Sequence, residues 1–313
     1  MITLFPGWDA YNQAKFLLER FSWNDLGFIE GKPAYELNNV RMWIFEDGIL
    51  FEDAIDLRWN NETGEVVKEV IFPSRHAAAS GKPSLTLHPI GVPHLELNES
   101  PPFGGLAGFA PPPSTRLASW WKMLNNYVAD TDLGMKFELT LEVTHHGPKL
   151  DVPAMFIEIG STNKDWPNQH AAELLARIIA DGMALNGGSD VGLWDSELNS
   201  GELVLITLGG GHYAPRANKL AALDGIWLGH MLATYALPFV KSDDEDKIPK
   251  GTWRQAIDAV VNSTKAAFPN GKIIISMDKK AFRGWQRQAI RDYLAGRGIP
   301  LLTTKQILEL LDN

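Results

Sequence analysis

The sequence contains no cysteine, which removes several kinds of chemistry from consideration. Disulfide bonds, thiolate zinc sites and a cysteine nucleophile are all excluded. Apolar runs are also short, and none approaches the ~18 residues that a membrane span requires. The opening stretch, MITLFPGWDAYNQAKFLLERF, lacks the basic segment, the long apolar segment and the small-residue cleavage site of a secretory signal. We therefore expect a soluble, cytoplasmic protein with no membrane partner.

Several common catalytic and nucleotide-binding motifs are missing as well. No Lys-Ser or Lys-Thr follows the glycine-rich segment GGGH, so this segment is not a P-loop, and no GxGxxG opens a first βα unit. The GxSxG elbow of serine hydrolases and the HExxH motif of zinc proteases are also absent. Dinucleotide-binding, serine-hydrolase and zincin functions therefore have no support in the sequence.

Charge is unevenly distributed along the chain. The formal net charge is −9, yet residues 272–297 contain seven basic and two acidic side chains. Arg283, Arg287 and Arg291 recur every four residues, so they would lie on one face if the stretch RGWQRQAIRDYLAGRG (283–298) is helical. Such a stripe suits either a solvated helix surface or contacts with phosphate groups. Both interpretations stay open at this point.

Apolar β-type segments alternate with helical segments, which is the pattern of an α/β protein. The predicted strands are 66–72, 136–144, 154–160, 202–209 and 272–277. The predicted helices are 13–21, 114–128, 167–185, 216–223, 252–267 and 284–296, with a short helix at 227–235.

Three other segments interrupt this pattern without marking a domain boundary. Residues 80–113 are rich in proline and glycine and predict a long loop, a feature that is usually functional inside a compact domain. Residues 186–201 predict a surface insertion, and the acidic run at 242–247 predicts an exposed connection. We expect one domain over residues 1–313.

Polar side chains gather where four predicted strands end. They are Ser74, Arg75 and His76, then His145 and His146, then Glu158, and finally His212. In open α/β sheets the ligand crevice lies at the carboxyl ends of the strands. We therefore expect these side chains to meet in one site.

The adjacent pair His145–His146 poses a geometric problem, because neighbouring side chains of a strand face opposite ways. Regular alternation places His146 on the polar face with Glu142, and His145 on the apolar face. Gly147–Pro148 interrupts the strand pattern, however, and such a break could turn both rings into the crevice. The sequence leaves both arrangements open.

Glu158 lies within the apolar run AMFIEIG, and a buried carboxylate needs a partner or a proton. A neighbouring histidine, a metal ion or Arg75 would supply one. The three glycines before His212 permit close approach of the backbone to a ligand, and their N–H groups can bind an anion. Histidines and carboxylates without cysteine suit a zinc site, and they suit metal-free acid–base hydrolysis equally.

The order of these motifs resembles one known family. SRH, KPSLTLH, EVTHHGP, FIEIGS and GGGHYAP follow one another as in the D-aminoacyl-tRNA deacylases of the archaeal and plant type, between residues 66 and 300. The resemblance implies hydrolysis of the ester between a D-amino acid and the 3′ end of tRNA, with Zn²⁺ as cofactor. It also implies a three-layer α/β/α fold of the phosphorylase/peptidyl-tRNA hydrolase type, around a mixed, mostly parallel central sheet.

The motif positions and the resemblance together assign roles to the candidate residues. The expected catalytic residues are His76, Glu142, His146, Glu158 and His212. The expected zinc ligands are His145, His146, His212 and Glu158. The expected substrate-binding residues are Ser74, Arg75, His88, Gly210, Gly211, Tyr213, Arg283 and Arg287. The resemblance also turns His230, in WLGHML, from an expected core residue into a candidate site residue.

The expected partner is the acceptor end of a tRNA that carries a D-amino acid, bound by a monomeric chain. The amides of Gly210 and Gly211 would face the oxyanion or the terminal phosphate. The basic stripe at 279–291 would contact acceptor-stem phosphates without reading sequence. Two alternatives remain: a peptidyl-tRNA hydrolase or zinc-dependent amidohydrolase on the same scaffold, and a non-catalytic module that binds tRNA or metal.

Overall fold

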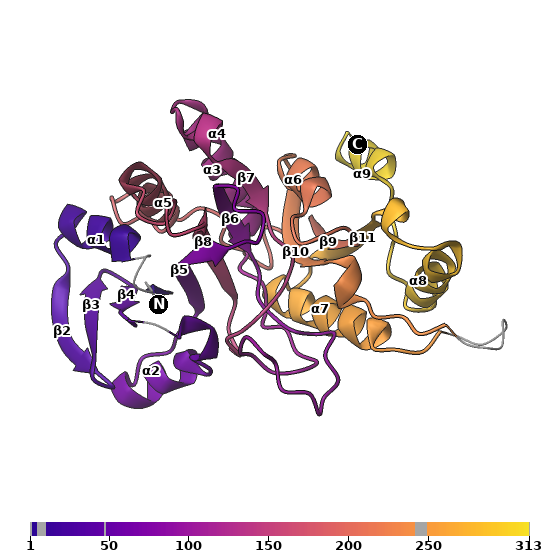
Figure 1. Ribbon diagram of the computed structural model, residues 1–313, viewed down its shortest axis with the longest axis horizontal. Coiled ribbons are helices and arrows are strands. Elements are labelled where there is room, and N and C mark those ends of the chain that lie inside the picture. Colours follow the sequence, from indigo (N-terminus) through magenta and orange to yellow (C-terminus); the bar gives the residue numbers. More distant parts are fainter. Residues whose placement is uncertain (1, 5–10, 47, 242–248, 313) are drawn as a thin grey trace.

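The computed structural model describes residues 2–4, 11–46, 48–241 and 249–312, so the acidic run at 242–247 lies outside the described residues. The strands are β1 (Ile2–Leu4), β2 (Asn24–Ile29), β3 (Lys32–Leu37), β4 (Val40–Trp43), β5 (Glu69–Ala77), β6 (Ser84–His88), β7 (Glu138–Leu141), β8 (Ala154–Ser161), β9 (Leu203–Leu208), β10 (Ile226–Leu232) and β11 (Lys272–Met277). The α-helices are α1 (Tyr11–Arg20), α2 (Ile55–Thr63), α3 (Leu117–Ala129), α4 (Leu133–Lys136), α5 (Gln169–Gly182), α6 (Pro215–Ala221), α7 (Trp253–Ala267), α8 (Gly284–Gly296) and α9 (Thr304–Leu311). The N-terminal strands β2–β4 lie at one end of the molecule and helices α8 and α9 at the other (Figure 1).

The strands form two sheets that meet edge to edge. The larger has the order β2-β3-β4-β1-β5-β8-β6-β7, and the smaller has the order β10-β9-β11. They join through the segment after β7, where the Val143 N–H donates to His212 O over 3.0 Å and the Thr144 N–H donates to Met231 O over 2.7 Å. Of the nine strand pairs among the described residues, six are parallel. The α/β class and the mixed, mostly parallel pairing are confirmed, with the expected single sheet divided at β7.

Helices cover both faces of the smaller sheet, because its central strand is apolar on both sides. In β9, Leu203 and Leu205 pack in one cluster with residues of α3 and α6, whereas Val204 and Ile206 pack in another with residues of α7 and α8. Successive side chains of a strand point to opposite faces, so this continuous apolar run requires a layer on each side. The result is an α/β/α arrangement. No helix in the described part of the chain is both long enough and apolar enough to cross a membrane.

The prediction of a short helix at 227–235 is wrong. These residues form strand β10, parallel to β9, followed by a 3₁₀ turn at Thr234–Ala236. A Cβ added at Gly229 would lie 2.7 Å from Thr264 of α7, so glycine permits the close packing of helix on strand. Burial of β10 on both faces removes the alternation by which a strand is recognised in a sequence.

The predicted loop at 80–113 contains strand β6, which corrects that prediction. All five residues of β6 are buried, and the strand lies between β8, to which it is antiparallel, and β7, to which it is parallel. The surrounding prolines and glycines mask this short strand in the sequence. Its position in the sheet is what brings His88, its last residue, next to the ends of the other strands.

The insertion at 186–201 is anchored to the fold by a buried arginine. Arg116, in the turn before α3, is 2% exposed. Its guanidinium donates to Glu69 Oε2 over 2.8 Å and to Asp190 Oδ1 over 2.9 Å. Glu69 also accepts a hydrogen bond from Ser114. This network fastens the insertion to β5 and to the start of α3.

The substitution Glu69→Ala is expected to lower the free energy of unfolding by about 3 kcal/mol, because it leaves a buried guanidinium without its nearest carboxylate. Chemical denaturation followed by tryptophan fluorescence measures the change. Lys122→Ala is the matched control, since Lys122 pairs with the exposed Asp224 and its loss should have no measurable effect. Equal destabilisation by the two substitutions would contradict the role given to the buried network.

Candidate active site

Seven ionisable side chains meet at the strand ends, and for five of them (His76, His145, His146, Glu158 and His212) the sequence predicts this convergence. They come from β5 (His76), β6 (His88), the segment after β7 (Glu142, His145 and His146), β8 (Glu158) and the loop after β9 (His212). The register of the sheet places three of them on one face. Glu158 of β8 lies opposite Ser74 of β5 and Thr86 of β6, and His76 and His88 come two residues after these on the same strands. Segments far apart in the chain thus supply one cluster.

Glu142 is the centre of one half of the cluster. Its side chain is fully buried, and Oε2 lies 2.9 Å from His212 Nε2 and 3.2 Å from His76 Nδ1. Burial by itself raises the pKa of a carboxyl group. Here the hydrogen bond from His212 and the positive charges of His88 and His76 outweigh burial and hold the pKa of Glu142 below its usual value. Glu142 is therefore a carboxylate that orients two imidazole rings.

His212 is held by this carboxylate and faces an open pocket. A carboxylate only accepts hydrogen bonds, so Nε2 of His212 carries the proton and Nδ1 keeps a lone pair. The side chain is 37% exposed and lines a pocket of about 430 Å³ together with His76, Tyr213 and residues 77–80. A base oriented by a carboxylate and open to solvent is the pair that activates water in many hydrolases.

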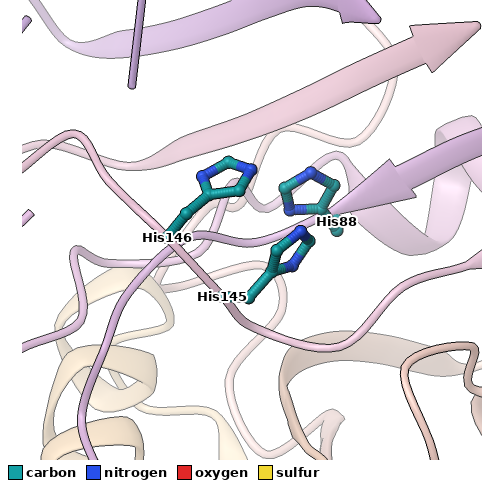
Figure 2. Close-up of side chains that lie close together, drawn as sticks. All are labelled: His88, His145 and His146. Carbon is teal, nitrogen blue, oxygen red and sulfur yellow. The ribbon is translucent and has the colours of Figure 1, made fainter. Parts of the chain in front are cut away.

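His88, His145 and His146 form the other half of the cluster (Figure 2). Their possible ligand atoms lie within 4.8 Å of one another. In each ring Nδ1 lies 2.7–3.1 Å from the carbonyl oxygen of a residue one or two positions away. A carbonyl only accepts, so Nδ1 carries a proton, and in a neutral ring Nε2 then keeps a free lone pair. Histidines oriented by carbonyls in this way are typical metal ligands.

The protonation states of these rings follow from burial and neighbouring charge. Burial is the main cause that lowers the pKa of His145 and of His146, and the charge of nearby imidazoles adds to it; for His146 the pKa falls to about 3. Burial also opposes protonation of His88, but the hydrogen bond and charge of Glu158 outweigh it and raise the pKa of His88. His145 and His146 are therefore neutral at pH 7 and can donate lone pairs.

The backbone conformation explains how the adjacent side chains of His145 and His146 point into the same cluster. β7 ends at Leu141, three residues earlier than predicted, so the alternation of a strand does not extend to this pair. His146 has a φ of +42°, in the left-handed region that non-glycine residues rarely adopt. The two ring centroids lie 4.2 Å apart. Both rings thus turn into the cluster, which is the arrangement that a break at Gly147–Pro148 predicted.

The four expected zinc ligands do not form one group in the structure. His145 and His146 lie with His88, which was expected only to bind substrate. His212 belongs instead to the group around Glu142. Glu158 is buried 3.5 Å from His88 Nε2 and 3.7 Å from His76 Nδ1, so histidines rather than Arg75 are its partners.

Two residues that were expected to bind substrate, Gly210 and Arg75, contact other parts of the protein instead. The Gly210 N–H donates to Thr234 Oγ1 over 3.1 Å and is not free for an oxyanion, whereas Gly211 is exposed beside His212. Arg75 projects from the opposite face of β5 to His76 and lies 4.6 Å from the ring centroid of Trp166. Arg75 therefore does not join the cluster.

The three arginines near α8 do not form a uniform stripe. Arg287 Nη1 donates to Lys279 O over 3.0 Å and to Phe282 O over 2.8 Å, so this guanidinium supports the turn before the helix. Arg283 precedes α8 instead of lying within it. Arg283 and Arg291 are exposed.

Two of the remaining expected residues border the cluster. Ser74 is buried on the same face of β5 as His76. The ring centroid of Tyr213 lies 5.9 Å from that of His76. Tyr235 was not expected: its hydroxyl lies 3.5 Å from His212 Nδ1, and no local motif could reveal it because the 3₁₀ turn after β10 carries it there.

His230 lies outside the cluster and braces the junction of the two sheets. Its Nδ1 lies 2.9 Å from Thr144 Oγ1, and its Nε2 lies 3.1 Å from Pro111 O and 3.0 Å from Ser263 Oγ. Burial lowers the pKa of His230 to about 3. It is therefore a neutral structural residue, as the composition of its segment suggested, and not a residue that faces substrate.

Comparison with known proteins connects this geometry to a family. The D-aminoacyl-tRNA deacylase family matches residues 63–302, a span that contains every residue of the cluster. The chain belongs to this family. The resemblance seen in the motifs is thereby confirmed.

Relatives in the family come from a plant and from archaea. A D-aminoacyl-tRNA deacylase of Arabidopsis thaliana is 48% identical over 271 residues, which cover 85% of each chain. A D-aminoacyl-tRNA deacylase of Thermococcus kodakarensis is 31% identical and covers 74% of this chain and 79% of its own. A crystal structure described as a conserved protein of unknown function matches with a TM-score of 0.75 at 22% identity, over 98% of this chain and 96% of its own. This last match supports the fold alone.

Because the folded state keeps His230 neutral, the free energy of unfolding is expected to decrease as the pH is lowered below about 6.5. Above the ordinary histidine pKa of about 6.5, the folded and unfolded states are both neutral at this residue. As the pH falls from there toward 3, only the unfolded state takes up the proton, at a cost of up to about 1.4 kcal/mol per pH unit. Urea unfolding of His230→Gln at pH 7, 6 and 5 should give a shallower loss of stability than wild type.

The exposed His170 provides the control for this prediction. His170→Gln should leave the pH dependence of unfolding unchanged. If His230→Gln and wild type lost stability in parallel between pH 7 and pH 5, the neutral state assigned to His230 would be incorrect.

Proposed function

We propose that the protein hydrolyses the ester bond between a D-amino acid and the 3′ end of tRNA, and so releases free D-amino acid and reusable tRNA. Membership of the D-aminoacyl-tRNA deacylase family supports this substrate class. The observation that carries the chemistry is the 2.9 Å contact between His212 Nε2 and the buried Glu142 carboxylate. It leaves the second nitrogen of His212 available to a water molecule in the adjoining pocket.

The proposed reaction uses His212 as the general base. Nδ1 of His212 takes a proton from water, and the water oxygen bonds to the ester carbonyl carbon. The bond from that carbon to the ribose oxygen then breaks, and the proton passes to the departing ribose oxygen. Glu142 holds the ring in the required tautomer and stabilises its transient positive charge. His76, stacked on His212 and 3.2 Å from the same carboxylate, fixes the position of Glu142.

The pocket beside His212 offers a basis for choosing the D-enantiomer. Ala77, Ala78 and Ala79 form one wall, and Tyr213 lies across from His76. This apolar wall suits an amino-acid side chain. In the L-enantiomer the side chain and the α-amino group exchange places, so one of the two would meet an unsuitable surface. Selection by fit needs no special reactive group.

We further propose that His88, His145 and His146 bind Zn²⁺ through Nε2. The supports are the three convergent imidazole rings and the absence of any cysteine, which together suit imidazole ligation with an open fourth position. A zinc ion held there would lower the pKa of bound water or polarise the ester carbonyl. Glu158, 3.5 Å from His88 Nε2, would balance the charge.

The acceptor end of tRNA would lie over the basic surface next to the glycine-rich loop. Lys279, Lys280 and Arg283 are exposed there and suit contacts with phosphates of any tRNA sequence. All residues of the catalytic cluster come from one chain, which suits a monomer. A cytoplasmic location fits a tRNA substrate.

The direct test compares D-Tyr-tRNA, L-Tyr-tRNA and N-blocked Tyr-tRNA as substrates. Wild type should hydrolyse the D-form at least 100-fold faster than the L-form, and His212→Ala and Glu142→Gln should lower kcat on the D-form by about 10²–10⁴-fold. Hydrolysis is measured by chromatography of the free amino acid that is formed. His170→Ala, an exposed histidine, is the matched control and should retain full activity.

Preference for the N-blocked substrate would favour the peptidyl-tRNA hydrolase alternative. Folded His212→Ala and Glu142→Gln variants with unchanged kcat would show that the cluster does not catalyse the reaction, whereas a wild type without activity on any of the three substrates would favour the non-catalytic binding module.

The zinc proposal predicts different metal contents for the two halves of the cluster. Purified wild type should contain about one Zn²⁺ per chain by elemental analysis, and dialysis against a chelator should remove both the metal and the activity. His146→Ala should lose the metal, whereas His212→Ala should keep it although it loses activity. Loss of metal from both variants, or from neither, would contradict the assignment of ligands.

A further inference from the structure

A second cleft lies beyond the catalytic cluster, at the carboxyl end of β11. It has a volume of about 540 Å³ and lies between the C-terminal half of α8 and the start of α9. Pockets of this size hold small ligands or single groups of a larger one. Its cationic lining residues are Arg216, Lys279, Lys280, Arg291 and Lys305.

The cleft is strongly basic on an acidic protein. Five cations line it, but Asp278 is the single carboxylate among the lining residues described, and its side chain accepts a hydrogen bond from the Lys280 N–H. The whole chain carries a net charge of −9, so the cations are locally concentrated. The positive end of the α9 dipole opens onto the same space. Such a lining favours an anion.

The other side of the cleft is apolar. Met277, Ala295, Ile299, Leu301 and Leu302 contribute to its walls. An inorganic anion would leave these side chains without a partner. A ligand that joins a phosphate to a flat or carbon-rich group, such as a nucleotide unit of RNA, contacts both sides.

The backbone links this cleft to the catalytic loop. The Asp278 N–H donates to Leu208 O over 2.8 Å, four residues before His212. A Cβ added at Gly209 would lie 2.7 Å from the Phe282 ring, so the glycine-rich loop packs closely on the turn that carries Lys279 and Lys280. A group bound at this turn is therefore held against the segment that presents the general base.

Arg216 makes a second link. It lies in α6, four residues after His212, and its guanidinium donates to Ser276 Oγ over 2.9 Å and to Thr304 Oγ1 over 3.1 Å. The side chain thus spans from the helix that follows the catalytic loop to the first residue of α9. It places a fixed positive charge between the cleft and the catalytic cluster.

We propose that this cleft binds one nucleotide of the tRNA acceptor arm, with its phosphate on the cations and its ribose or base on the apolar wall. The inference rests on the proposed deacylase function, since it assigns the cleft to the same substrate. Binding here, against the turn that supports the glycine-rich loop, orients the aminoacyl end toward His212.

The test compares two substrates that differ in the nucleic-acid part. D-Tyr-tRNA reaches the cleft, whereas D-tyrosyl-adenosine, which has no phosphate, does not. Arg291→Ala/Lys305→Ala should lower kcat/KM for D-Tyr-tRNA at least 10-fold and change kcat/KM for D-tyrosyl-adenosine less than twofold. The dependence of log KM on log salt should weaken by about one unit of slope.

A double variant with the same change of charge is the control. Lys15 and Lys136 are exposed on α1 and α4, away from the cleft (Figure 1). The variant Lys15→Ala/Lys136→Ala should have the wild-type kcat/KM for D-Tyr-tRNA and for D-tyrosyl-adenosine. Equal losses in the two double variants would reduce the effect to general charge and overturn the proposal. So would equal losses on both substrates.

Binding of deacylated tRNA separates this proposal from the proposed function. If wild type hydrolysed neither D-aminoacyl substrate, the deacylase function would fail. Fluorescence anisotropy with labelled, deacylated tRNA would still report whether Arg291→Ala/Lys305→Ala weakens binding at least 10-fold relative to the control variant. Unchanged tRNA affinity, or tight binding of AMP alone that does not compete with tRNA, would overturn the assignment of the cleft.

Discussion

The arrangement of the molecule depends on one buried negative charge, the carboxylate of Glu142. A charge removed from water costs several kcal/mol unless hydrogen bonds and opposite charges compensate for it. The chain supplies that compensation from distant segments, with His76 at the end of β5 and His212 after β9. The same requirement that keeps Glu142 ionised therefore aligns the imidazole that can act as a base.

The peptide segment that carries Glu142 also joins the two sheets. Val143 and Thr144 bond to the His212 loop and to β10, and His230 supports Thr144 from behind. A shift of one sheet against the other would thus disturb Glu142 and His212 together. Directly after this junction the chain leaves strand geometry at His146, which turns two further rings into the cluster. The contacts that join the two sheets are therefore also the contacts that position the cluster.

The cluster divides into two halves with different electrostatics. Glu142 is held ionised by the histidines around it, whereas burial and the charge of neighbouring imidazoles keep His145 and His146 neutral. One half thus contains an ionised carboxylate, and the other contains neutral imidazoles. Glu158 stands near both halves, within 3.7 Å of His76 and 3.5 Å of His88. Glu158 therefore lies between the two halves and contacts a histidine of each.

The sequence by itself determined the family and the α/β class. It also indicated where most of the ionisable cluster would lie, because polar residues that follow apolar strands converge at the carboxyl ends of an α/β sheet. Only the tertiary structure decided which residues share a task. β10 and β6 escaped prediction because double-sided burial and flanking prolines erase alternation, and β6 is what brings His88 to His145 and His146. Arg75 lies against the Trp166 ring and Arg287 donates to Phe282 O, and neither contact is visible in the sequence because each depends on which segments pack nearby. Spacing along a chain encodes local periodicity, whereas this site is assembled from contacts between segments far apart in the chain, such as Glu142 with His212, 70 residues away.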